Sequence, residues 1–169
     1  MKSYKSEEEF IDIVERCLKN NGCKTWREIV PDSCESWSMP WRADLIFFRE
    51  DFGYIGIEGK NIRTLGQGGV ISDAVDQIEN KYRKQTYLKG NMIGKWGILV
   101  PMECGYLQKD NVLATNMVKT FLRNFLRKRY NICLLEYSPS SKWRNEGVTF
   151  DAMTPNCIKI GGENTYGES

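Results

Sequence analysis

The first strongly patterned part of the chain is an amphipathic stretch that begins after Ser6. Apolar side chains recur there at intervals of three and four, as they do on one face of an α-helix: Phe10, Ile11, Val14, Cys17 and Leu18. Ser6 stands before a run of glutamates, which is typical of a helix start, since a serine hydroxyl caps free backbone amides and acids favour the positive end of the helix dipole. Asn21 and Gly22 predict the end of this helix.

The rest of the chain alternates between strand-like and helix-like patterns. Strands are expected at about 24–30, 42–48 and 54–60, and the last two are separated by a short gap that ends in Gly53, which indicates a hairpin. Four more elements are expected further on: a helix from a Ser72 cap to about Leu88, a buried strand at 96–100, a helix at about 111–129 and a strand at 132–137. A last strand at 148–152 precedes a polar, Gly-rich tail that is expected to fray.

This order, α-β-β-β-α-β-α-β, predicts the fold class. We expect an α/β protein with a mixed β-sheet, in which an antiparallel three-strand meander is joined to crossover strands and flanked by helices on both faces. A length of 169 residues suits a single domain, and the sequence contains no internal repeat and no evident boundary. We therefore expect one domain over residues 1–169.

Composition excludes several classes of protein. The chain has no apolar run long enough for a transmembrane helix, and its charged N-terminus lacks the apolar stretch of a signal peptide, so no membrane association and a cytoplasmic location are expected. Six cysteines are irregularly spaced, which favours free thiols over disulfides, with a structural zinc site a distant second. The chain has no histidine, and this excludes Ser-His and Cys-His catalysis and the histidine-based nucleases.

The net charge of +2 is too small to indicate a nucleic-acid partner by itself. Its distribution is more informative, because residues 109–129 contain six basic residues and one acid. This helix could present a phosphate-facing stripe or simply a solvated face, and the sequence does not separate the two.

Two carboxylates are expected to meet in the hairpin. Side chains alternate along a strand, so Gly56, Glu58 and Lys60 share one face. If residues 49–53 form the loop, Asp44 lies directly opposite Glu58, with the two Cβ atoms about 5 Å apart. The alternative is a solvated sheet face with a weak Glu58–Lys60 ion pair.

Such a pair of like charges repels unless a cation lies between them, which is the physical argument for a metal ion. Oxygen ligands without histidine or cysteine favour Mg²⁺ or Mn²⁺ over zinc. Lys60 reaches the same space, where its charge could position a water, lower the pKa of that water or stabilise the charge on a phosphate.

Asp44, followed on the next strand by Glu58-Gly59-Lys60 and then by a helix, resembles the PD-(D/E)xK nuclease superfamily. Ala43 stands where the family often has proline, and the similar pattern covers about residues 7–101, which would form the catalytic core, with 102–169 completing the fold. The resemblance implies that Asp44 and Glu58 bind the metal and that the backbone carbonyl of Gly59 completes the site. It also implies that Lys60 acts on the attacking water.

Two more residues match features of the family. Many members carry a glutamate on the first helix that reaches the metal directly or through water, and Glu7 lies in the middle of the core-facing stripe, with Glu8 and Glu15 at its edge. The alternative for Glu7 is a frayed helix end. Several subfamilies carry a glutamine on the later helix that contacts the substrate, which Gln77 matches, unless it is an ordinary surface residue.

The resemblance implies a Mg²⁺-dependent endonuclease that hydrolyses DNA, similar in size to the archaeal-type Holliday junction resolvases, with small restriction or mobile-element endonucleases equally open. Such enzymes usually act as homodimers. Two alternatives remain: a non-catalytic DNA-binding or assembly module with the same fold, and an unrelated α/β scaffold protein.

Overall fold

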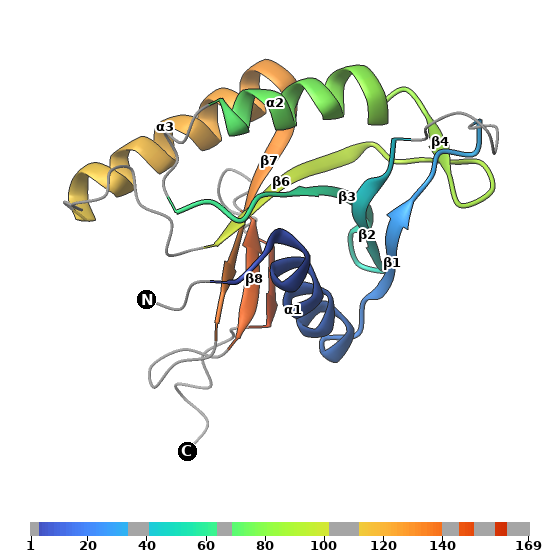
Figure 1. Cartoon of the computed structure of the whole chain (residues 1–169), viewed down its shortest axis with the longest axis horizontal. Helices are drawn as coiled ribbons and strands as arrows, with labels where there is room; N and C mark the ends of the chain where they lie inside the picture. The colour runs from blue at the N-terminus through green and yellow to red at the C-terminus, as the bar shows by residue number, and fades with distance from the viewer. Residues whose placement is uncertain are drawn as a thin grey trace.

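A twisted sheet with helices on both faces forms the centre of the molecule (Figure 1). The computed structural model of the chain describes the following residues: 4–33, 41–63, 69–101, 112–139, 146–150 and 158–161. Within these ranges seven strands form one mixed sheet in the order β1-β2-β3-β6-β7-β8-β9. The predicted α/β class and the predicted mixed sheet are confirmed.

The strands of this sheet begin with the expected antiparallel meander, and the two crossover strands β6 and β7 are parallel to β3. Their bounds are β1 Lys24–Ile29, β2 Ala43–Arg49, β3 Gly53–Gly59, β6 Lys95–Pro101, β7 Ile132–Ser138, β8 Gly147–Phe150 and β9 Ile158–Gly161. The helices are α1 Glu7–Asn20, α2 Val70–Gln77, the π-helical turn η1 Ile78–Tyr82 and α3 Val112–Tyr130.

Each face of the sheet is covered by a separate hydrophobic cluster. On one face, Phe10 and Leu18 of α1 pack with Phe47 and Ile57 of the sheet. On the other, α2 and α3 form an outer layer whose apolar side chains pack around Trp96 (Figure 1). No helix among the described residues is long and apolar enough to cross a membrane.

Helix α1 begins as its sequence predicts. The Oγ of Ser6 accepts a 3.1 Å hydrogen bond from the amide of Glu9, which satisfies one of the free donors of the first turn. The helix ends at Asn20, and Gly22 follows with a φ of +83°, a left-handed conformation that glycine adopts without strain.

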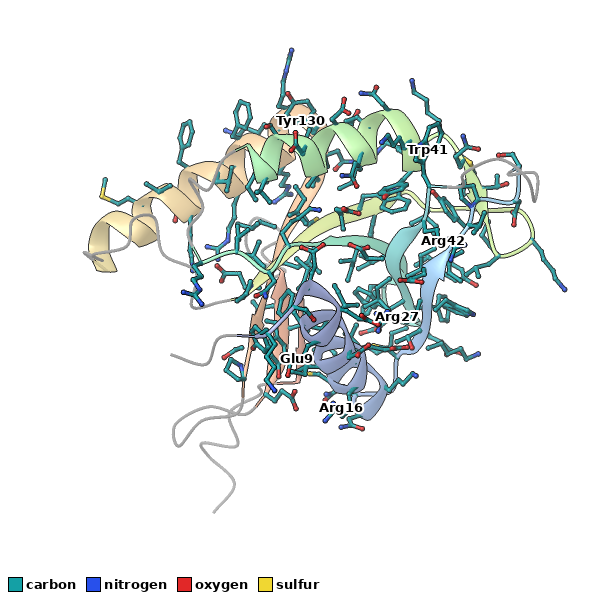
Figure 2. All side chains as sticks on the ribbon, viewed as in Figure 1. Glu9, Arg16, Arg27, Trp41, Arg42 and Tyr130 are labelled. Atoms are coloured by element: carbon teal, nitrogen blue, oxygen red, sulfur yellow. The ribbon has the colours of Figure 1, made fainter. Side chains whose placement is uncertain are left out.

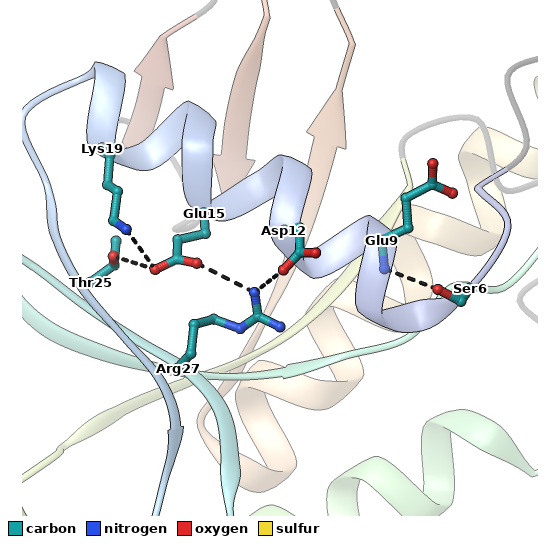
Figure 3. Close-up of polar contacts among 7 residues, drawn as sticks. All are labelled: Ser6, Glu9, Asp12, Glu15, Lys19, Thr25 and Arg27. Carbon is teal, nitrogen blue, oxygen red and sulfur yellow. Dashed lines mark hydrogen bonds and ion pairs between the residues drawn. The ribbon is translucent and has the colours of Figure 1, made fainter.

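An ion-pair network ties α1 to strand β1 (Figure 3). Arg27 of β1 donates to Asp12 and, at 3.3 Å, to Glu15 Oε2 on the helix. The other oxygen of Glu15 accepts a 2.8 Å hydrogen bond from Thr25 and lies 3.1 Å from the ammonium of Lys19. Arg27 therefore connects two helical turns of α1 to the edge of the sheet.

Replacing Arg27 by alanine is expected to lower the free energy of unfolding by about 1–2 kcal/mol, because a partly buried guanidinium that bridges two carboxylates would be lost. Lys19→Ala is the control. Its side chain is 59% exposed, so its loss is expected to change stability by at most about 0.5 kcal/mol. Urea denaturation of both variants measures the difference, and an equal effect of the two substitutions would contradict the bridging role of Arg27.

The bounds predicted for the second helix are wrong at both ends. Gly69, and not Ser72, precedes α2, and the hydroxyl of Ser72 donates to the Gly69 carbonyl at 2.8 Å. The helical segment stops at Tyr82, and a small hairpin of β4 (Thr86–Tyr87) and β5 (Asn91–Met92) follows.

A contact from a distant residue holds the hairpin that follows the helical segment. The carboxylate of Asp32 accepts hydrogen bonds from the amides of Lys89 (3.1 Å) and Gly90 (2.7 Å), and Leu88 and Lys89 adopt left-handed conformations in the turn. The periodicity of the sequence continues to Leu88, but a tertiary contact overrides it.

The tail also differs from its prediction. The strand expected at 148–152 is β8, which ends at Phe150 within the described residues, whereas 151 and 152 lie outside them. The expected fraying is wrong for Ile158–Gly161, because this segment forms β9 and pairs with β8 in antiparallel register.

Candidate active site

The hairpin of β2 and β3 has the predicted register. Phe48 pairs with Tyr54 and Leu45 pairs with Ile57, so Asp44 and Glu58 stand at the next opposed position, near the start of β2 and the end of β3. The turn is shorter than expected, because Arg49 and Gly53 still pair.

Strand β3 presents Glu58 to the side of the sheet covered by α2. Gly56 has the same orientation, since a Cβ at that position would lie 2.4 Å from the ring of Trp96. A larger residue there would displace the indole that fills the core between the sheet and α2. Lys60 follows directly after the strand, and its amide donates a 2.8 Å hydrogen bond to the carbonyl of Leu99 in β6.

Glu58 and Lys60 form a buried ion pair. Lys60 Nζ lies 2.9 Å from Glu58 Oε1, and the side chains are only 13% and 4% exposed, respectively. The interpretation as a solvated sheet face is therefore wrong. Within the part of the chain that the structure describes, the second carboxylate oxygen, Glu58 Oε2, is buried and has no hydrogen bond of normal geometry. The hydroxyl of Tyr82 is nevertheless near enough to this carboxylate to lower its pKa. A buried carboxylate oxygen with no well-formed hydrogen bond is unfavourable, and it is open to a cation or a water.

Asp44 is held beside this pair by the backbone of β3. Its Oδ2 accepts a 2.8 Å hydrogen bond from the amide of Gly59. Gly59 is also where Ile11 of α1 approaches most closely, since a Cβ on Gly59 would lie 2.1 Å from Ile11 Cδ1. Gly59 therefore contacts the site through its amide, while a role for its carbonyl in metal binding stays a prediction.

Burial and mutual repulsion shift the pKa values of both carboxyls. Burial is the largest cause for Asp44, and together with the charge of Glu58 it raises the pKa of Asp44 to about 7, against the opposing effect of the Gly59 amide. Burial also raises the pKa of Glu58, although Lys60 opposes this. Two carboxyls that both resist ionisation are typical of a site that is completed by a positive charge.

Lys60 experiences the opposite balance. Burial alone would lower its pKa, but the hydrogen bond to Glu58 and the charges of Glu58, Glu7 and Asp44 together raise the pKa above its ordinary value. Lys60 is therefore an ammonium at neutral pH.

Glu7 is the acid of α1 that lies at the site. Its Oε1 is 3.9 Å from Lys60 Nζ, and its Oε2 accepts a 3.4 Å hydrogen bond from the amide of Asn61. Glu15 is engaged with Arg27 instead. Glu7 is nevertheless half-exposed and contacts the lysine, and the described residues contain no group of three Asp, Glu or Cys side chains placed to share a metal ion. Its direct role as a metal ligand thus stays a prediction.

Tyr82, which sequence reasoning missed, forms the wall of the site toward α2. Its hydroxyl lies 3.0 Å from the Arg42 carbonyl and 3.2 Å from Gln77 Oε1, and its ring stacks on Trp96. Burial, the charges of Glu58 and Asp44, and a hydrogen bond to Glu58 raise its pKa, so the phenol stays protonated. Arg42, labelled in Figure 2, directly precedes β2. Gln77 therefore reaches the site through Tyr82.

One feature of the sequence does point to Tyr82. The residue lies four positions after Ile78, on the core-facing side of the helical segment, and a tyrosine at such a position needs a partner for its hydroxyl. The π-helical turn Ile78–Tyr82 supplies the local change that ordinary helical periodicity does not predict.

The basic residues of α3 do not form one phosphate-facing stripe. Lys119 and Arg123 contact the buried Glu136 of β7, at 3.1 Å and 2.8 Å. Lys128 and Arg129 are exposed near the end of the helix, and Lys109 lies outside the described residues. Two of the five basic residues that the structure describes in this run thus belong to the packing of α3 on the sheet.

The cysteines agree with the free-thiol prediction wherever they are described. Cys17, Cys23 and Cys133 are free, and the other three lie outside the described residues. Burial raises the pKa of Cys17 to about 12, which makes it an inert core residue and not a reactive thiol.

A hard divalent cation fits the donors that are present. Asp44 and Glu58 supply only oxygen, they stand at opposed positions, and one buried oxygen of Glu58 has no hydrogen bond of normal geometry among the described residues. Mg²⁺ commonly uses one or two protein carboxylates and completes its shell with water and phosphate oxygens. Comparison of the chain with protein-family models, with curated proteins and with solved structures found no match.

Proposed function

We propose that this protein is a Mg²⁺-dependent endonuclease, with Mn²⁺ as a substitute, that hydrolyses phosphodiester bonds of DNA. The observation that carries the proposal is the opposed pair Asp44 and Glu58, with Lys60 in contact and with a buried Glu58 oxygen that has no hydrogen bond of normal geometry in the described part of the chain. The resemblance of the Asp44 and Glu58-Gly59-Lys60 pattern to PD-(D/E)xK nucleases supplies the substrate class.

Asp44 and Glu58 would hold the metal, and the carbonyl of Gly59 and a water on Glu7 would complete its surroundings. A bound Mg²⁺ polarises a phosphoryl oxygen and lowers the pKa of water. The Gly59 amide keeps Asp44 in place through its 2.8 Å hydrogen bond, and Tyr82 with Gln77 closes the opposite wall.

Lys60 acts by its charge in this proposal. Because its pKa is raised, the ammonium does not accept a proton near neutral pH, and it is suited to stabilise the negative charge that grows on the phosphate. Its contact with Glu58 keeps it within reach of the same space.

We further propose that the enzyme is cytoplasmic. We also propose that it acts as a homodimer, since cutting both strands of a duplex requires two sites. Duplex and branched DNA are both proposed substrates. A non-catalytic DNA-binding module with the same fold is the alternative, but two neighbouring carboxyls that share the single ammonium of Lys60 are unfavourable in a protein that does not use them.

The test is cleavage of supercoiled plasmid and of a branched junction, in Mg²⁺ or EDTA. We expect cleavage only with the metal, complete loss in Asp44→Ala, and a decrease of at least about 100-fold in Lys60→Ala, because a transition-state charge contact is removed. Lys24→Ala, an exposed lysine on the edge strand, is the matched control and should cleave normally. Cleavage in EDTA or in both site variants would overturn the proposal, and Mn²⁺-dependent binding without cleavage would favour the binding module.

A further inference from the structure

Helix α3 exposes a stripe of large apolar side chains to solvent. Met117, Phe121 and Phe125 are 65%, 70% and 45% exposed, and they follow one another at intervals of four, so they share one side of the helix. The rings of Phe121 and Phe125 stack, with centroids 6.3 Å apart and planes 12° from parallel. Three of the five large apolar side chains exposed by the described residues therefore lie in one stripe, which indicates an interaction surface and not scattered exposure.

An apolar groove lies beside this ridge, between α2 and α3. Its volume is about 620 Å³, and its apolar lining consists of Ile71, Val75, Leu122, Phe125, Leu126 and Tyr130. Tyr130, labelled in Figure 2, lies where the two helices meet in the outer layer. The same face of the molecule thus carries a protruding aromatic ridge and a groove that can receive one, which is the self-complementary shape that a two-fold interface requires.

The charges on the two sides of this face are opposite. The α2 side carries the exposed acid Asp76 in the groove wall and the exposed acid Asp73 three positions before it, whereas Glu79 of the same wall is already paired with Arg83. On the α3 side, Lys128 and Arg129 flank Phe121 and Phe125. DNA or an anionic membrane would meet the acidic side and be repelled. A second copy in antiparallel orientation instead brings each basic side against the acidic side of its partner.

We propose that the α2–α3 face is a two-fold interface between two copies of this chain, in which Phe121 of each copy enters the α2–α3 groove of the other. This inference rests on the proposed function, because it assigns a surface to the homodimer proposed there. The test of the interface measures molecular mass and not cleavage. A failure of the interface and a failure of the nuclease proposal are therefore distinguishable.

Sedimentation velocity of the full chain over a range of concentrations tests the interface. We expect a dimer for the wild type, and a dissociation constant raised by at least about 30-fold in Phe121→Asp, since truncation of a central aromatic contact typically has an effect of this size and the two-fold axis repeats it. Met92→Asp is the matched control, because Met92 is 65% exposed but lies on β5. A monomeric wild type, or a dimer that Phe121→Asp leaves intact, would overturn the proposal.

Charge reversal tests the antiparallel arrangement separately. We expect one variant with Lys128→Glu and Arg129→Glu, and another with Asp73→Lys and Asp76→Lys, to be monomeric alone, because each homodimer would juxtapose like charges. Mixed in equal amounts, the two should form a heterodimer in which every opposed pair is again of opposite sign. Failure of the mixture to dimerise would overturn the antiparallel arrangement.

Discussion

Replacing Asp44 by asparagine is expected to abolish metal-dependent cleavage and, at the same time, to stabilise the metal-free protein at pH 8. The loss of cleavage should be about 10³-fold or more, because a metal ligand contributes several kcal/mol to the transition state and each 1.4 kcal/mol is about a tenfold change in rate. The gain in stability follows from the raised pKa of Asp44. It is an increase in the free energy of unfolding, whereas the ordinary loss of a contact decreases that free energy.

The sign follows from proton binding. Since burial and Glu58 raise the pKa of Asp44 from 3.8 to about 7, the folded protein holds a proton between these values that the unfolded chain releases. The contribution of Asp44 to stability therefore falls as the pH rises through this window, and above pH 7 its full unfavourable effect is present. Asparagine carries no charge and avoids this effect, so we expect a gain on the order of 2 kcal/mol, or about 4–8 °C in Tm.

Thermal unfolding at pH 8, with and without Mg²⁺, measures both parts of this prediction. Mg²⁺ should raise the Tm of the wild type but leave that of Asp44→Asn unchanged. Asp51→Asn is the control and is expected to lower the Tm slightly. The exposed carboxylate of Asp51 pairs with Arg49, which lowers the pKa of Asp51 and makes the charged form favourable. A lower Tm for Asp44→Asn than for the wild type in EDTA would contradict the electrostatic account of the site.

The opposed carboxylates were predictable from the sequence because the hairpin depends on local rules. A short turn that ends in Gly53, with strands of alternating pattern on both sides, sets the register, and the register brings Asp44 opposite Glu58. The burial of Glu58 was not predictable in this way. It depends on Tyr82, which approaches Glu58 from a distant part of the chain and stacks on Trp96.

The elements that the sequence did not predict share one physical cause. The hairpin β4–β5 depends on hydrogen bonds from Lys89 and Gly90 to Asp32, and β9 forms only because β8 offers it an edge. Neither has a local pattern strong enough to specify it. Tyr82 belongs to the same group, because the role of its hydroxyl depends on two other residues. One is the distant Arg42, through its carbonyl, and the other is Gln77, which the π-helical turn brings close to the hydroxyl.

The rate of cleavage is expected to depend steeply on pH when Mg²⁺ is subsaturating. A proton and the metal compete for the carboxylate of Asp44, so the affinity for Mg²⁺ should fall about tenfold for each pH unit below about 7, and the rate should fall with it. Between pH 7 and pH 5 the expected decrease is about 100-fold. Because burial also raises the pKa of Glu58, the two carboxyls titrate as a pair, which steepens the dependence of the rate on pH.

Single-turnover rates from pH 5 to pH 9, at several Mg²⁺ concentrations, separate this mechanism from base catalysis by Lys60. Competition predicts that the midpoint moves down by about one pH unit for each tenfold increase in Mg²⁺. If Lys60 acted as a base, the rate would instead rise with pH at a midpoint that does not depend on the Mg²⁺ concentration. That midpoint would lie above the ordinary pKa of lysine, because Glu58 raises the pKa of Lys60. A midpoint fixed near 4 at all Mg²⁺ concentrations would mean that Asp44 ionises like an exposed carboxylate, and metal binding at the Asp44–Glu58 pair would then be excluded as the source of the pH dependence.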